Sequence, residues 1–123
     1  MIFENLKPQV ESIISNTNID KKDQLLKVCE LLETHIDYYN WVGFYFKNGD
    51  KEELVLGPYV GAPTDHTVIA CSITVKAEIV VPIFVNGENI GQIDIDSNTP
   101  DPFTEADERF LEFVNTQVAK LLS

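Results

Sequence analysis

The sequence predicts an α+β fold in which helices pack on an antiparallel sheet. Two segments near the N-terminus and one at the C-terminus repeat apolar residues at helical spacing. Between them lie two β-rich stretches, each interrupted by an Asn-Gly pair that suits a tight hairpin turn. With 123 residues the chain is long enough for one hydrophobic core but not for two, so we expect a single domain, residues 1–123.

The two N-terminal helices are predicted from the spacing of their apolar side chains. The first runs from Leu6 to Ile14 and ends at the polar stretch 15–18. The second follows Asp20, a residue type that caps helices. Its apolar stripe contains Leu25, Val28, Cys29, Leu32 and Ile36. We therefore expect the side chain of Cys29 to point into the core.

The first hairpin is predicted around Asn48-Gly49. Residues 41–46 and 53–56 are rich in β-formers and flank this turn. The segment 57–63 contains two glycines and two prolines, which interrupt a strand ladder, so it is predicted to be an irregular loop. The stretch 68–75 fits either a strand or a loop.

The second hairpin and the last helix are the clearest elements. Residues 78–84 and 89–96 are β-rich and flank a turn at residues 85–88, so the two runs should pair antiparallel. Thr104 with Asp107 three residues later is typical of a capping box at the start of a helix. That helix is expected to bury Phe110, Leu111, Val114, Val118 and Leu121.

Composition narrows the classes of function. Nine Lys and Arg against twenty Asp and Glu give a formal net charge of −11, which makes nucleic acid an unsuitable partner. No apolar run approaches the roughly 18 residues of a membrane span, and the first residues lack the basic and apolar regions of a secretory signal. A cytoplasmic location is expected.

The two cysteines, Cys29 and Cys71, are too few for a disulfide framework or a zinc site, so both should be thiols.

The second hairpin carries a candidate site of acidic residues. Asp94 and Asp96 alternate with isoleucines along one strand, so both carboxylates lie on one face. If Gly87 takes the left-handed position of a three-residue loop, Glu78 falls opposite Asp94 and joins this patch. A two-residue Asn86-Gly87 turn would instead shift the register by one and place the acids among isoleucines. We predict the first register.

Three interpretations of this acidic patch are open. The first is that the patch is a solvated acidic face, which is common in a chain of charge −11. It is also a candidate ligand site, because carboxylates that repel one another are stabilised by an ammonium group. A divalent cation such as Mg²⁺ is the third option, since Asp-x-Asp pairs bind hard cations, although no phosphate-binding glycine loop accompanies it.

Two further groups of residues are candidates for a site. Trp41, Gly43 and Tyr45 share one face of the first strand, and the missing side chain at Gly43 predicts a gap between two aromatic rings. The alternative is that these aromatics belong to the core. Cys71 lies in a polar context after a loop with His66 and could be partly exposed. His66 and His35 carry no strong indication of catalysis.

Taken together, four motifs resemble the free methionine-(R)-sulfoxide reductases, which are single GAF domains. The motifs are Asn40-Trp41-Val42-Gly43-Phe44-Tyr45, Leu54-Val55-Leu56-Gly57-Pro58-Tyr59, Glu78-Ile79-Val80-Val81-Pro82-Ile83 and Gly91-Gln92-Ile93-Asp94-Ile95-Asp96-Ser97. The resemblance covers nearly the whole chain. It implies a GAF-like antiparallel sheet with two N-terminal helices and one C-terminal helix packed on it.

The resemblance also implies roles for individual residues. Trp41 and Tyr45 would form an aromatic wall around the sulfoxide and methyl end of the substrate. Glu78, Asp94 and Asp96 would receive its α-ammonium group and help to protonate the sulfoxide oxygen. The thiolate of Cys71 would attack the sulfoxide sulfur and give methionine and a sulfenic acid. No metal and no organic cofactor are expected. An external thiol or a thioredoxin-like protein would be the reductant, and a homodimer is implied.

The chain departs from this family at one place. Between Val68-Ile69 and Ala70-Cys71 the family carries a further segment that holds the other redox cysteines, a helix and a strand. Two of three cysteines are therefore absent, and Cys29 is poorly placed to replace them. The alternative function is a catalytically impaired GAF module that binds a small amino-acid-like ligand or mediates dimerisation. In the enzyme Cys71→Ser should abolish turnover, whereas in a binding module it should change little.

Overall fold

The computed structural model describes residues 2–49, 53–61 and 75–123. Its elements follow the predicted order of two helices, two hairpins and a closing helix, which confirms the α+β class. They are α1 (Ile2–Ser15), α2 (Lys21–His35), β1 (Trp41–Lys47), β2 (Leu54–Gly61), β3 (Ala77–Val85), β4 (Glu88–Ser97) and α3 (Glu105–Leu122). Cys71, His66 and nearly all of the ambiguous stretch 68–75 lie outside the described residues.

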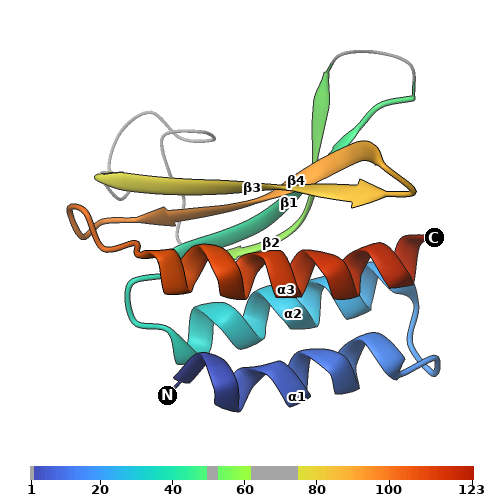
Figure 1. Cartoon of the computed structure of the whole chain (residues 1–123), viewed down its shortest axis with the longest axis horizontal. Coiled ribbons are helices and arrows are strands. Elements are labelled where there is room, and N and C mark those ends of the chain that lie inside the picture. The colour runs from blue at the N-terminus through green and yellow to red at the C-terminus, as the bar shows by residue number, and fades with distance from the viewer. Residues whose placement is uncertain (1, 50–52, 62–74) are drawn as a thin grey trace.

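All three helices lie on one side of the sheet, as Figure 1 shows. α2 contacts β1 and β2, α3 contacts β3, and α1 packs against α2 and α3. The rings of Phe3 and Phe110 stack at 4.8 Å between centroids and join α1 to α3. Within the described part of the chain, no helix combines the length and the apolar character needed to span a bilayer.

The described residues form a four-stranded antiparallel sheet in the order β2-β1-β4-β3. Its helix-side face supplies the core, because alternate residues of each strand point toward α2 and α3. The core residues of the strands are Val42, Phe44, Val81, Ile83, Ile93 and Ile95. No helix of the described residues lies on the other face of the sheet, which presents the intervening side chains.

The register of the β3–β4 hairpin differs from the prediction. Asn86 (φ 52°) and Gly87 (φ 81°) form a two-residue turn, and Val85 pairs with Glu88. Further along, Ile83 pairs with Gly91, so Ile90 is an extra residue that bulges from the ladder and shifts the register by one. With the two-residue turn alone, the register would place the acids on the core face. The bulge shifts the register by one and places them on the opposite face.

A second correction concerns β2. The predicted loop from Gly57 onward is wrong as far as Gly61, because the strand continues through Pro58 to Gly61. β2 lies at the edge of the described sheet, and its register with β1 shifts between the pairs Gly43–Tyr59 and Tyr45–Leu56. Gly57 and Pro58 therefore fall at a bulge of an edge strand, where a proline is tolerated. The carbonyl of Pro58 also accepts a hydrogen bond from the Cys29 thiol at 3.6 Å.

The caps of α2 and α3 form as predicted. Asp20 accepts a hydrogen bond from the backbone N–H of Asp23 at 2.8 Å. The carboxylate of Asp107 accepts from the backbone N–H of Thr104 at 2.9 Å and from its hydroxyl at 3.0 Å. The other oxygen of Asp107 accepts from the hydroxyls of Tyr38 and Tyr39 at 2.7 and 2.8 Å. This buried carboxylate therefore ties the start of α3 to the segment that leads into β1.

Candidate functional site

The strand pairing gathers most of the predicted site residues on the helix-free face of the sheet. Trp41 pairs with Asp96, and Asp96 pairs with Glu78. In the next row on this face Gly43 pairs with Asp94, which pairs with Val80. The predicted pairing of Glu78 with Asp94 is therefore wrong by two positions. Because two positions on a strand preserve the face, the three acids still lie together.

The three carboxylates form a tight cluster. One oxygen from each of Glu78, Asp94 and Asp96 lies within 4.8 Å of the others. Asp94 and Asp96 are only 3% and 1% exposed, whereas Glu78 is open to solvent. A ligand would therefore reach the cluster from the β3 side. Burial of two of the three acids makes a purely solvated acidic face a poor description of this patch.

Burial and the neighbouring acids change the protonation of Asp94. Desolvation, followed by a hydrogen bond with Glu78 and the charge of Asp96, raises the pKa of Asp94 from 3.8 to about 9. Asp94 therefore retains its proton at neutral pH. Its Oδ1 has no hydrogen-bond partner among the described residues. The cluster thus offers both a proton donor and buried oxygen atoms that suit a cation.

The aromatic residues beside the cluster are arranged differently from the prediction. A Cβ built on Gly43 would lie 2.4 Å from the Cη2 atom of Trp41, so the indole ring already fills the space above this glycine. The expected gap between Trp41 and Tyr45 is therefore absent, and their ring centroids lie 6.3 Å apart. Gly43 is required because any side chain there would collide with the indole.

Tyr59 is a member of the aromatic group that the sequence interpretation missed. Its ring stacks on Trp41 with 5.5 Å between centroids and 22° between planes. Tyr59 pairs with Gly43 across the β1–β2 ladder and is 45% exposed. The segment 57–63 was predicted to be a loop, so the register that brings Tyr59 beside Trp41 could not be inferred.

Tyr45 is close enough to the three acids for their charges to affect its hydroxyl. Partial burial, and then the charges of Asp94, Asp96 and Glu78 in that order, raise the pKa of its hydroxyl. Tyr45 therefore remains a neutral hydrogen-bond donor over the physiological range. It links the aromatic group to the carboxylate cluster.

Asn40 holds the end of β4 that carries Asp96, and sequence reasoning did not identify it as a site residue. Its backbone N–H donates to the Asp96 carbonyl at 3.0 Å. Its side-chain oxygen accepts from the backbone N–H of Asn98 at 2.9 Å and from the Ser97 hydroxyl at 3.4 Å. Its place at the start of the motif of residues 40–45 was the signal in the sequence that could have identified it.

The other candidates lie away from the cluster or outside the described residues. Cys71 and His66 fall among the residues that the structure does not describe. Cys29 is fully buried on the helix side, as predicted, and desolvation raises the pKa of its thiol. His35 is exposed at the end of α2. Neither Cys29 nor His35 shares the sheet face of the acids.

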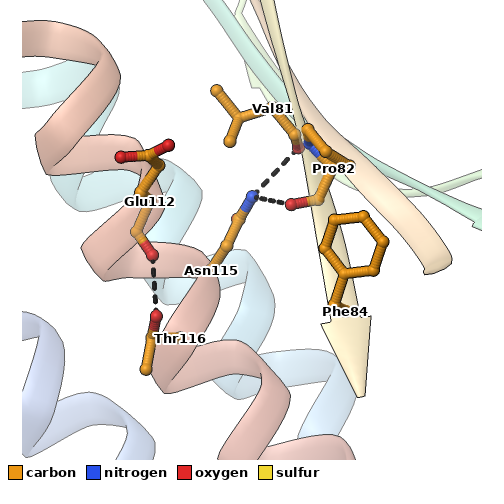
Figure 2. A pocket seen from close by; sticks show the side chains of 6 residues that line it. All are labelled: Val81, Pro82, Phe84, Glu112, Asn115 and Thr116. Carbon is orange, nitrogen blue, oxygen red and sulfur yellow. Dashed lines mark hydrogen bonds between the residues drawn. The ribbon is translucent and has the colours of Figure 1, made fainter. Parts of the chain in front are cut away.

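A cavity of about 240 Å³ lies between β3 and α3, separate from this cluster. Figure 2 shows the residues that line it. Val81, Pro82 and Asn115 are among its lining residues, and the three acids are not. The side-chain amide of Asn115, which is 5% exposed, donates to the carbonyls of Val81 and Pro82 at 2.9 Å each. We assign the site to the acidic face because three clustered carboxylates, two of them buried, lie there beside aromatic rings.

Comparison with known proteins agrees with this fold. The family model described as "GAF domain" matches residues 50–122. GAF domain-containing protein A of Dictyostelium discoideum is 32% identical over 148 aligned positions, which cover 98% of this chain and 89% of the relative. Because 148 positions exceed the 123 residues of this chain, the relative contains residues without a counterpart here. This agrees with an internal shortening of the chain.

Two reductases are similar as well. The free methionine-R-sulfoxide reductase of Escherichia coli (strain K12) is 31% identical over 127 positions, covering 80% of this chain and 76% of the relative. The crystallised free methionine-R-sulfoxide reductase of Neisseria meningitidis, in complex with its substrate, superposes with a TM-score of 0.82 at 28% identity. That match covers 97% of this chain and 87% of the other. The chain therefore belongs to the GAF domain family that includes the free methionine-R-sulfoxide reductases.

Proposed function

We propose that this protein reduces free L-methionine-(R)-sulfoxide to methionine. The observation that carries the proposal is the cluster of Glu78, Asp94 and Asp96 beside the Trp41 and Tyr45 rings on one sheet face. Free methionine sulfoxide has complementary groups, an ammonium ion for the carboxylates and a methyl sulfoxide end for the aromatic rings. The substrate complex of the Neisseria meningitidis relative supports a small amino-acid ligand.

Each group of the cluster has a proposed task. Glu78 and Asp96 receive the α-ammonium group, because carboxylate oxygens form charge-assisted hydrogen bonds with it. Asp94, which retains its proton at neutral pH, donates that proton to the sulfoxide oxygen. Trp41 and Tyr45 enclose the sulfoxide and methyl end of the substrate and exclude water from it.

Cys71 is the proposed nucleophile. Its thiolate attacks the sulfoxide sulfur, the protonated oxygen passes to the cysteine, and methionine leaves. The sulfoxide gains two electrons and Cys71 loses two, becoming a sulfenic acid. An external thiol then condenses with the sulfenic acid and releases water, and a second thiol reduces the resulting disulfide. Burial of Cys29 on the helix side supports an external thiol over internal resolution.

The proposed setting follows from this chemistry. The reductant is a dithiol or a thioredoxin-like protein, no metal or organic cofactor takes part, and the cytoplasm supplies the reducing conditions. A homodimer is proposed by analogy with the family. The chain as a whole, residues 1–123, is proposed to act as one GAF domain.

The test is consumption of free L-methionine-(R)-sulfoxide with dithiothreitol as the reductant. The wild type should turn over the R epimer and not the S epimer. Cys71→Ser should lose turnover yet still bind the sulfoxide, and Cys29→Ala should retain turnover as the matched cysteine control. Equal loss in both cysteine variants would contradict the assignment of Cys71. Binding without turnover by the folded wild type would identify a binding module instead of an enzyme.

A further inference from the structure

We propose that Tyr59 is a positioning residue of this site, because its ring stacks on the Trp41 indole and fixes the orientation of the indole beside the carboxylate cluster. The proposal deepens the proposed function and rests on it for the identity of the ligand. The stack itself is a property of the fold and can be tested without any ligand.

The position of Tyr59 follows from the strand order. β2 and β4 flank β1 on opposite sides, so Tyr59 on β2 and the acids on β4 lie on opposite sides of the Trp41 ring. We infer from this order that the stack, with 5.5 Å between ring centroids, covers the side of the indole toward β2. The indole therefore stands between an aromatic support and the acidic cluster.

Gly43 completes this arrangement. The indole occupies the space above Gly43, and a Cβ at that position would lie 2.9 Å from the Cβ of Tyr59. The space above Gly43 is thus bounded by Tyr59 on one side. Loss of the Tyr59 ring would remove this boundary on the β2 side of the indole. No other described aromatic ring stacks on Trp41 in parallel; Tyr45 is tilted by 34° and lies further away.

The expected consequence is a change in substrate affinity with little change in chemistry. Trp41 is proposed to contact the apolar end of the substrate, while proton donation and nucleophilic attack belong to other residues. Loss of the Tyr59 ring should therefore raise KM and leave kcat within roughly 2-fold of the wild type. One aromatic stack corresponds to an increase of roughly 2- to 12-fold in KM.

Two substitutions separate the ring from the hydroxyl. Tyr59→Leu removes the aromatic ring, whereas Tyr59→Phe retains it and should behave like the wild type. Val55→Ala is the matched control, because Val55 lies on the same edge strand, is 51% exposed and pairs with Phe46 outside the stack. Tyr59 is nearly half exposed, so its replacement should leave the helix-side core folded, as thermal unfolding would verify.

Trp41 supplies a direct readout because it is the only tryptophan in the chain. In Tyr59→Leu we expect altered tryptophan emission and more efficient acrylamide quenching, together with the higher KM for free methionine-(R)-sulfoxide. Unchanged emission and quenching in Tyr59→Leu would overturn the stack, and changed fluorescence with unchanged KM would overturn the positioning role. A Tyr59→Phe variant as impaired as Tyr59→Leu would also overturn it. A wild type that neither binds nor reduces the sulfoxide would refute the proposed function separately, leaving fluorescence to decide the stack.

Discussion

Replacing Asp94 with asparagine should stabilise the folded protein at neutral pH. In the unfolded chain the carboxyl titrates near 3.8, and in the folded protein burial raises its pKa to about 9. A raised folded pKa means that the contribution of Asp94 to stability is fully present below pH 3.8 and is lost as the pH rises through about 9. Each pH unit in that window lowers the free energy of unfolding of the wild type by about 1.4 kcal/mol.

The magnitude at neutral pH follows from this window. Between pH 3.8 and 7 the folded state keeps a proton that the unfolded state has released. For a site as buried as this one, the wild type loses up to about 4 kcal/mol of unfolding free energy over that range. Asparagine resembles the protonated carboxyl in shape and has no charge to desolvate. Its N–H groups can donate to the carboxylates of Glu78 and Asp96, which lie next to it.

Urea unfolding of both proteins at pH 4, 5.5, 7 and 8.5 measures the effect. The free energy of unfolding of Asp94→Asn should nearly equal that of the wild type at pH 4 and exceed it increasingly as the pH rises. Glu11→Gln, a change at an exposed acid on α1, controls for the loss of one negative charge. Parallel pH profiles for the wild type and Asp94→Asn would refute the reasoning, because they would show that folding does not change the protonation of Asp94.

Three other substitutions test contacts that hold the sheet and the helices together. Asn115→Leu removes two hydrogen bonds to β3 carbonyls and should lower the free energy of unfolding by about 2 kcal/mol, measured with urea; a loss below about 0.5 kcal/mol would contradict this role. Asp107→Asn leaves one buried oxygen in place of two acceptors and should cost about 1–3 kcal/mol in the same assay, whereas an unchanged midpoint would show that the tyrosine contacts are weak. Gly91→Ala would place a Cβ 2.2 Å from the Tyr45 carbonyl oxygen and should prevent β1–β4 pairing, so a native circular dichroism spectrum and wild-type melting temperature would disprove that contact.

The sequence predicted the order of the elements because the helical periodicity, the capping residues and both Asn-Gly turns are local signals. The length of β2 could not be predicted in the same way, because it depends on the position of the strand in the assembled sheet. Gly57 and Pro58 would interrupt a central strand, but they are tolerated because β2 lies at the edge of the sheet. Edge position is a property of the assembled sheet, so the extension of the predicted strand to Gly61 and the position of Tyr59 beside Trp41 were both missed.

The acidic cluster shows how a correct grouping came from an incorrect register. The predicted three-residue loop and the observed two-residue turn with a bulge at Ile90 differ by two positions, and a shift of two preserves the face. The bulge itself has no distinctive residue, although the side-chain oxygen of Asn89 accepts a hydrogen bond from the Gly91 N–H at 3.0 Å beside it. The orientation of the Trp41 ring could not be predicted because it depends on the choice of rotamer.

The hydrogen bonds of Asn115 have a consequence for the solubility of the protein. β3 lies at the free edge of the sheet that the described residues form, and Val80 and Phe84 are exposed on it by 41% and 53%. Such an edge can recruit a strand from another molecule and start aggregation. Pro82 offers no N–H at this point, and the carbonyls of Val81 and Pro82 are already occupied by Asn115. An incoming strand would therefore lack a backbone donor at Pro82, which disfavours intermolecular β-pairing at the middle of this edge as the described residues form it.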